Sequence, residues 1–431
     1  MAASIDWQLT RCHRPLPSSL LPEGFPVLSD ASSDLLCEPA VVFLYETFVR
    51  AKINYADKEY SVTNLANDLK GWFTYLEHVE LDWSEATESH VAGYIHAMAI
   101  TIAPKTAKFH SEQTMKRRVS TVSNLYRWAA RVHFCKWDDS NDELLLQKAS
   151  TSRGARYFKW PDCSSKQDAY RIKGLLKDEA KEIFKKLGER PTKHEQAWKD
   201  FGQGVSKSLP PSAKDRLAAE MALNAGLRVF ECTRLKLGAV QKYLDDIENI
   251  VATKLYPVDI KGKGGKTLPT NFSGALLLQI AAYVRGERAC CNPRCDTVLV
   301  NPPHYGPSLM GRQCTTRTLE KRFSEACIAL GVLREEEYFA IGDDGRYEST
   351  PRKRKCPKYV FHDLRHTFAF WTYLARRWTD AEPWKYVSEQ LRHASIETTL
   401  KIYLAHINAY EAIVSDDFLE SFKTRRGGAK N

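Results

Sequence analysis

The sequence has no long apolar run. Its longest nearly apolar stretch, Ala275 to Val284, is too short to cross a bilayer. The N-terminal residues, which read MAASIDW, lack the basic segment followed by an apolar stretch that marks a secretion signal. We therefore expect a cytoplasmic chain with no membrane partner.

The sequence also lacks the cysteine pattern of a disulfide framework. Eleven cysteines are an odd number spread along a large chain, which favours reduced thiols when no export signal is present. Cys290, Cys291 and Cys295 do cluster, with His304 and Cys314 downstream. Zinc sites usually have two regularly spaced ligand pairs, and here the second pair is missing. Ordinary thiols are favoured over structural zinc, and we expect no metal.

The chain carries a net charge of +10 that is unevenly distributed. Its 431 residues predict two or three domains, and a hydrophobic fraction of 43% excludes wholesale disorder. Residues 55–90 hold eight acids and two bases, whereas residues 103–136 hold eight bases and one acid. A positive balance can be a solvated surface, so its distribution says more about partners than its total.

Hydrophobic periodicity divides the chain into five parts. Residues 1–38 contain several prolines and predict an irregular arm, and residues 39–137 predict a small all-helical domain. A polar linker is expected at 138–170, a mainly helical domain with a small sheet at 171–425, and a basic tail at 426–431. Within the larger domain, the Gly-, Pro- and Ser-containing segment 188–212 predicts a loop.

The last helix of the first domain, expected from about Gln113 to Val132, carries bases beside its apolar stripe. These are Lys116, Arg117, Arg118 and Arg127. They indicate either a solvated helix face or a face that contacts phosphates, and charge alone leaves both readings open.

Four separated segments of the second half hold side chains that suit attack on a phosphodiester. In the first, Glu231 lies three residues after Arg228 and could hold it, although Arg-x-x-Glu is common in surface helices. In the second, Lys263 sits in a glycine-rich turn between two predicted strands, with Lys261 and Lys266 beside it. Such a lysine suits proton donation or phosphate contact, but the segment also fits an ordinary solvated turn.

The other two segments add histidines, an arginine and a tyrosine. His362 and Arg365 are three residues apart near the start of a predicted helix, where an anion would also meet free backbone amides. His393 and Tyr403 belong to the segment LRHASIETTLKIY. Among nineteen tyrosines, only this context distinguishes Tyr403.

In this order, the segments resemble the tyrosine recombinase (phage integrase) family. The family has an Arg after Gly-Leu, a Lys in a Gly-Lys-Gly hairpin, a His-x-x-Arg box, and a His followed by Ser-Ile-x-Thr-Thr and Tyr. The resemblance implies a mainly α fold, with a helical core-binding (SAM-like) domain before an α+β catalytic domain that holds a small antiparallel sheet. By this likeness, the catalytic positions are Arg228, Lys263, His362, Arg365, His393 and Tyr403, with Glu231 as the supporting acid.

The resemblance also implies an activity. The chain is expected to be a site-specific recombinase that integrates, excises or transposes a mobile element. Arg228 and Arg365 would contact the attacked phosphate, and Tyr403 would form a 3′-phosphotyrosyl link. His362 would be the base and Lys263 the acid. No cofactor is expected, because arginines take the role that magnesium plays in many phosphoryl-transfer sites.

His393 would hydrogen-bond the phosphate. Two features of the sequence depart from the family's pattern. Arg392 stands where the family usually has the glycine of Leu-Gly-His. The segment Arg334 to Tyr359 is an apparent insertion with four consecutive bases, Arg352, Lys353, Arg354 and Lys355. This run is either an extra DNA contact, which we favour, or a disordered basic loop.

The expected partner is double-stranded DNA with specific recombination sites, which would associate the protein with the nucleoid. Apolar residues at helical spacing from Ile407 to Phe422 indicate either packing on the chain's own domain or docking on a neighbouring protomer. The resemblance favours docking and a homotetramer on DNA. Two other functions fit the same residues: a type IB topoisomerase-like enzyme and a non-catalytic DNA-binding protein.

Overall fold

The computed structural model describes residues 5–12, 21–50, 55–136, 174–262 and 265–393, together with single positions up to 410. The predicted linker at 138–170 and tail at 426–431 lie outside the described residues. The chain divides into two compact units, residues 1–169 with 337–353 and residues 170–336 with 354–431. Among the described residues, no helix has the length and apolar character needed to cross a membrane.

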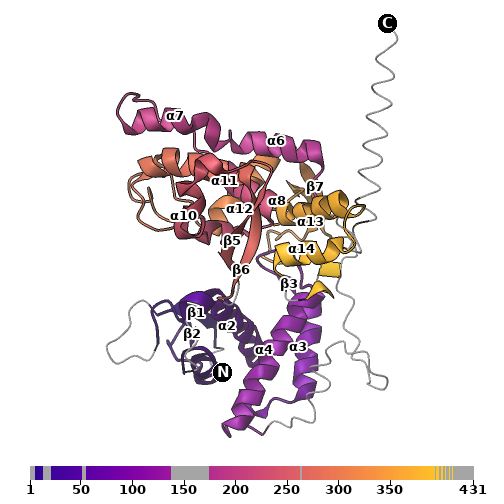
Figure 1. The fold of residues 1–431 in the computed structure, drawn as a ribbon. Helices are drawn as coiled ribbons and strands as arrows, with labels where there is room; N and C mark the ends of the chain where they lie inside the picture. Colours follow the sequence, from indigo (N-terminus) through magenta and orange to yellow (C-terminus); the bar gives the residue numbers. More distant parts are fainter. Residues whose placement is uncertain are drawn as a thin grey trace. The chain divides into compact units, whose positions relative to one another are not determined.

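The first unit is built from helices and two short hairpins (Figure 1). Its elements are β1 (Trp7–Arg11), β2 (Pro26–Asp30), α1 (Glu38–Tyr45), α2 (Tyr55–His78), α3 (Glu88–Ile100), β3 (Ile102–Ala103), β4 (Lys108–Phe109) and α4 (Glu112–Arg131). The predicted basic helix is confirmed as α4. It begins after Ser111, whose Oγ accepts a hydrogen bond from the Thr114 backbone N–H. Trp72 of α2 donates to the Tyr126 hydroxyl at 3.2 Å, so α2 and α4 share one core.

The expectation of an irregular N-terminal arm is wrong for residues 7–11 and 26–30. These strands pair antiparallel, with Leu9 opposite Leu28, and the side chain of Trp7 packs in the helical core. Pro26 stands at the first position of its strand, where proline is tolerated. Five-residue strands give too short an alternation to stand out among prolines.

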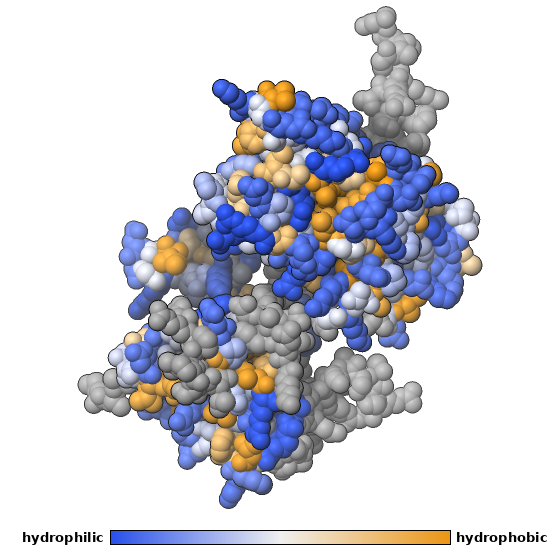
Figure 2. All heavy atoms as spheres, turned by 60° about the vertical axis from the view of Figure 1, so that its left-hand side comes forward, coloured by the Kyte–Doolittle hydropathy of each residue, from blue (hydrophilic) through white to orange (hydrophobic). Residues whose placement is uncertain are grey.

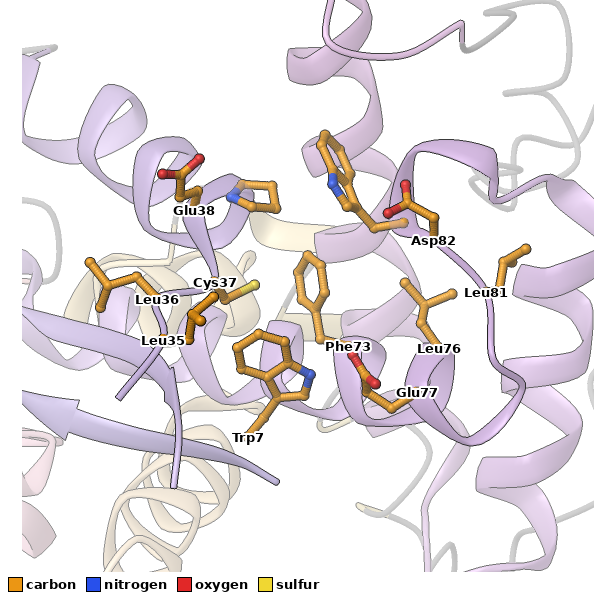
Figure 3. Close-up of a pocket in the computed structure, with 12 residues that line it drawn as sticks. Trp7, Leu35, Leu36, Cys37, Glu38, Phe73, Leu76, Glu77, Leu81 and Asp82 are labelled. Atoms are coloured by element: carbon orange, nitrogen blue, oxygen red, sulfur yellow. The ribbon is translucent and has the colours of Figure 1, made fainter. Parts of the chain in front are cut away.

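A cavity of about 540 Å³ opens in the first unit beside the N-terminal hairpin (Figure 3). The aromatic side chains of Trp7 and Phe73 lie in it, and the carboxylates of Glu38, Glu77 and Asp82 stand at its border. Of the predicted catalytic residues that the structure describes, none lines this cavity.

Helices surround the hairpin of β5 and β6 in the second unit (Figure 1). The elements from residue 177 onward are α6 (Lys177–Leu187), α7 (Pro191–Gly202), α8 (Lys214–Ala225), α9 (Val229–Arg234), α10 (Leu237–Asp245), β5 (Leu255–Lys261), β6 (Thr267–Ser273), α11 (Gly274–Tyr283), α12 (Thr316–Ala329), β7 (Leu333–Tyr338), β8 (Arg352–Pro357), α13 (Asp363–Arg376) and α14 (Pro383–Leu391). Of these, the end of β7 and the start of β8 belong to the first unit. The sheets are two-stranded and small, as predicted. Helix α8 is buried nearly all round, with Leu217, Met221 and Ala225 fully covered, so it forms the centre of this core.

The predicted hairpin is confirmed as β5 and β6. The strands pair antiparallel from Leu255 opposite Ser273 to Lys261 opposite Thr267. At the tip, the Gly262 N–H donates to the Lys266 carbonyl at 2.8 Å, which closes the turn. The turn residues 263 and 264, including the predicted catalytic Lys263, lie outside the described residues.

The predicted loop at 188–212 is wrong in its middle, where α7 forms. Pro191 stands at the first helical turn, where its missing N–H costs nothing. Trp198 is 1% exposed and anchors the helix, and its indole N–H donates to the Pro211 carbonyl at 3.3 Å. Burial of one large aromatic side chain therefore outweighs the loop-forming composition around it.

The C-terminal segment packs on its own unit at the two positions where it can be followed beyond Tyr403. Ile407 and Tyr410 are 3% and 1% exposed and join a cluster with Phe370, Val387 and Leu391. The Tyr410 hydroxyl accepts from the Trp371 indole at 2.7 Å and donates to the Leu175 carbonyl at 2.8 Å. These two side chains therefore pack on the chain's own unit, docking on a neighbour stays a prediction, and residues 411–422 lie outside the described part.

Candidate active site

Arg228 and Glu231 are joined at the start of α9. Helix α8 ends at Gly226, whose φ of +64° turns the chain so that Arg228 precedes the new helix. The Glu231 carboxylate accepts from the Arg228 backbone N–H at 2.7 Å and from its Nη1 at 3.0 Å. The Glu231 side chain is fully buried while 28% of the Arg228 side chain is exposed, so the acid holds a guanidinium that still reaches solvent.

The Arg365 side chain, on α13, is held by backbone carbonyls of two other segments. Its Nη1 donates to the Gly226 carbonyl and its Nη2 to the Leu391 carbonyl, and Nη1 lies 3.8 Å from Glu231. Burial, together with the charge of Arg228, lowers the pKa of Arg365 to about 9. The group stays protonated at neutral pH. The structure thus brings the two predicted arginines to one carboxylate.

His393 follows α14 and is neutral. Burial lowers its pKa to about 4, with further lowering from the charges of Arg365, Arg228 and Arg392. Its Nδ1 lies 2.7 Å from the hydroxyl of Thr399, a fully buried side chain. A neutral imidazole has one donor and one acceptor nitrogen. When the Thr399 hydroxyl donates to Nδ1, Nε2 carries the proton and can donate to an anion.

Replacing Thr399 by Val is therefore expected to slow the strand cleavage that the sequence implies by about 10-fold. This is the lower end of the effect of removing a side chain that orients a functional histidine. Val keeps the shape of Thr but removes the hydroxyl that selects the His393 tautomer. The measurement is the single-turnover rate of covalent protein–DNA adduct formation at pH 7.5. Thr399→Ser keeps the hydroxyl and should restore the rate, and a Thr399→Val rate within twofold of wild type would contradict this role.

Ring contacts connect the His-x-x-Arg box with Tyr403 and with His393. His362 is exposed at the start of α13, and its ring lies 4.9 Å from that of His366, edge to face. His366 in turn lies 5.4 Å from the Tyr403 ring, and His393 stacks on Tyr403 at 6.3 Å. The predicted base, phosphate ligand and nucleophile therefore meet in one place.

The Tyr403 side chain is buried. It is 1% exposed and packs edge to face on Phe370. Burial raises its pKa to about 12, even though Arg365 and Arg228 act in the opposite direction. The phenol is thus fully protonated at neutral pH, and a base is needed for it to attack.

The predicted DNA contacts on α4 are partly engaged within the first unit. Arg117 pairs with the buried Asp68, and the Nε of Arg118 lies 3.9 Å from the same carboxylate. Lys116 pairs with Glu112 at 2.5 Å. The Arg117 and Lys116 side chains remain 49% and 52% exposed, so both still present charge to solvent, whereas Arg118 is more enclosed. On the β5–β6 hairpin, Lys261 and Lys266 are exposed.

The inserted basic run forms strand β8 rather than a disordered loop, and β8 pairs with β7. Acids compensate part of its charge. Arg352 donates to Glu348 at 2.7 Å and Arg354 to Glu336 at 2.8 Å. All four bases of the run are exposed, and Lys353 and Lys355 alternate with the two paired arginines along the strand.

The clustered cysteines each bind a different neighbour. Cys290 donates to the Trp198 carbonyl, Cys291 to the Glu287 carbonyl, and Cys295 lies 3.1 Å from the Thr297 hydroxyl. In the part of the chain that the structure describes, no three His, Cys, Asp or Glu side chains are arranged to hold a metal ion. The ten described cysteines are free thiols.

Sequence reasoning missed three residues of this site. Thr399 and His366 lie within the motif segments, as the second Thr of Ser-Ile-x-Thr-Thr and the second His of His-x-x-Arg-His, but their contacts depend on tertiary packing. Arg392 was noted only as a departure. Its guanidinium contacts Glu231 at 2.5 Å, which places a third arginine beside the two that were predicted.

Two family models match the chain. The model described as the phage integrase family matches residues 203–409, and that described as the phage integrase N-terminal SAM-like domain matches residues 53–133. The matches contain every predicted catalytic residue and the basic helix α4. A search of the curated proteins finds no match.

Solved structures of site-specific recombinases are among those similar to this chain. XerH bound to palindromic difH substrate, in a post-cleavage complex, is 15% identical with a TM-score of 0.52, and the match covers 89% of this chain and 90% of that one. The XerH pre-cleavage complex is 16% identical with a TM-score of 0.48 over 86% of each chain. A lambda integrase dimer bound to a COC′ core site is 14% identical with a TM-score of 0.45, over 85% of this chain and 76% of that one.

Proposed function

The chain belongs to the phage integrase family of tyrosine-type site-specific DNA recombinases, and from this premise we propose that it cleaves and rejoins DNA through a covalent bond to Tyr403. The observation that carries this assignment to residues is the meeting of Arg228 and Arg365 at the Glu231 carboxylate, within electrostatic reach of Tyr403. Two fixed guanidiniums suit a phosphate whose non-bridging oxygens gain negative charge in the transition state.

In the proposed reaction, the Tyr403 oxygen attacks the scissile phosphorus and the bond from phosphorus to the 5′ oxygen breaks. His362 takes the phenol proton, and Lys263 gives a proton to the departing 5′ oxygen. Neutral His393 donates through Nε2 to a non-bridging oxygen. The products are a 3′-phosphotyrosyl link and a free 5′-hydroxyl, and the reverse reaction with another 5′-hydroxyl rejoins the strand.

We propose that the partner is double-stranded DNA with specific recombination sites, in the cytoplasm at the nucleoid. The proposed DNA contacts are Lys116, Arg117, Arg118, Arg127, Lys261, Lys266, Arg352, Lys353, Arg354 and Lys355. A homotetramer on DNA fits the exchange of four strand ends. Because Ile407 and Tyr410 pack on their own unit, any docking of the C-terminal segment would use residues after 410 or require its release.

The experiment is to trap wild-type chain on DNA by denaturation and to recover the attached DNA. The recovered fragments are expected to end in a protein-bound 3′ phosphate and to leave free 5′-hydroxyls that a kinase labels without prior phosphatase treatment. Since arginines supply the positive charge, adduct formation is expected to persist in excess EDTA. Free 5′ phosphates, or strict dependence on magnesium, would contradict the proposal.

A further inference from the structure

Arg392 occupies a backbone conformation that favours glycine. It follows α14 with φ 54° and ψ 44°, and its backbone N–H donates to the Glu389 carbonyl at 2.9 Å. This left-handed region carries a steric cost for a residue with a Cβ. The turn therefore has the geometry of the family's usual glycine, but with an arginine that bears the cost.

Burial of the Arg392 side chain also costs free energy. The side chain is 3% exposed, and its Nε is buried without a hydrogen-bond partner in the described part of the chain. Burial and the neighbouring charge of Arg228 lower its pKa. Glycine would avoid the backbone strain, the unmet donor and the buried like charge, but it would lose the contacts that the guanidinium makes.

The contacts of Arg392 join three segments of the site. Its Nη2 donates to Glu231 at 2.5 Å, and its Nη1 donates to the Thr270 hydroxyl at 2.5 Å and to the Gln390 carbonyl at 3.1 Å. Thr270 lies on β6, in the hairpin whose tip is the turn 262–266, and its hydroxyl donates to the same Gln390 carbonyl at 2.8 Å. Gln390 also accepts from the Asn271 backbone N–H through Oε1 at 3.0 Å.

Arg392 lies between two residues of the site and adds a positive charge to it. The residue before it, Leu391, supplies the carbonyl that holds Arg365, and the residue after it is His393. Around Glu231 stand three guanidiniums and one carboxylate, so the site is more positive than with Arg228 and Arg365 alone. Arg392 Nη2 and the Arg228 backbone N–H share the Oε2 atom of Glu231, while the Arg228 guanidinium bonds Oε1, so both oxygens of the acid are held.

We propose that Arg392 is a positioning residue that fixes Glu231, the β5–β6 hairpin and the His393 turn relative to one another for phosphate attack. The inference rests on the proposed function. It predicts that glycine, the family's usual residue and the better one for the turn, impairs the reaction in this chain.

The test compares Arg392→Gly with wild type on DNA recovered from covalent complexes. The single-turnover rate of adduct formation is expected to fall by about 30-fold, within the range for residues that orient a catalytic group, while the Kd for the same DNA changes less than threefold. The Tm should not fall by more than about 4 °C, since relief of backbone strain offsets the lost hydrogen bonds. Arg392→Lys keeps the charge without the forked geometry and should recover only part of the rate.

Two controls separate positioning from folding. Glu80→Gly relieves the same left-handed strain (φ 53°) at an exposed site in the first unit and should leave the cleavage rate unchanged. In a Glu231→Gln background, Arg392→Gly should lower the rate of adduct formation by less than fivefold, because the main partner of Arg392 has already lost its charge. A wild-type rate in Arg392→Gly would overturn the inference while leaving the proposed function intact, whereas failure of the wild-type chain to form any adduct would count against the function itself.

Discussion

Tyr403→Phe is expected to abolish covalent adduct formation while leaving DNA binding within twofold of wild type. Removal of an enzyme nucleophile costs on the order of 10⁵-fold or more in rate. Phenylalanine keeps the ring that packs against Phe370 and His366, so the fold should persist. The measurement pairs a denaturing gel for adducts with a binding assay on the same DNA.

Tyr410→Phe is the matched control for this prediction. Tyr410 lies in the same apolar cluster and is equally buried, but its hydroxyl forms hydrogen bonds with the Trp371 indole and the Leu175 carbonyl. Its removal should lower stability by about 1 kcal/mol and leave cleavage within a few-fold of wild type. An undiminished adduct in Tyr403→Phe would show that another residue is the nucleophile.

Arg365→Lys is expected to lower the single-turnover cleavage rate by about 10²- to 10³-fold, which is 2.7–4 kcal/mol of transition-state stabilisation. The guanidinium bridges the Gly226 and Leu391 carbonyls, and a lysine ammonium cannot span both in the same orientation. Charge is kept by this substitution, so its effect reports geometry. The Kd for target DNA should change less than tenfold.

Arg376→Lys, on the same helix, is the control for Arg365→Lys. Arg376 pairs with Asp380 at 3.0 Å, lies over the Tyr386 ring and is 36% exposed, so its partners lie outside the candidate site. Its cleavage rate should stay within twofold of wild type. A similar result for Arg365→Lys would exclude the proposed contact between Arg365 and the phosphate.

The parts of the fold that could be predicted are those with strong local signals. Helix α4 has a long apolar stripe and an N-capping serine, and the β5–β6 hairpin has strands of alternating burial around a glycine-rich turn. The catalytic candidates were found because four ordered motifs occur together. The structure brings Arg228, Arg365, His393 and Tyr403 into one site.

The missed features depend on contacts between distant residues. The N-terminal strands are stabilised by burial of Trp7 against α2, and α7 by burial of Trp198, neither of which local composition reveals. The contact of Arg392 with Glu231 spans 161 positions in the sequence. The arginine that replaces the family's usual glycine at position 392 thus adds a guanidinium that binds the Glu231 carboxylate.

The measurement that tests the central claim most directly is the location of the covalent bond in the wild-type adduct. The adduct would be digested with protease and nuclease, and the peptide carrying the residual nucleotide identified by mass spectrometry. The account predicts a single modified peptide with the 3′ phosphate on Tyr403. A phosphate bound to any other residue, or recovered cleaved DNA with no attached peptide, would contradict it.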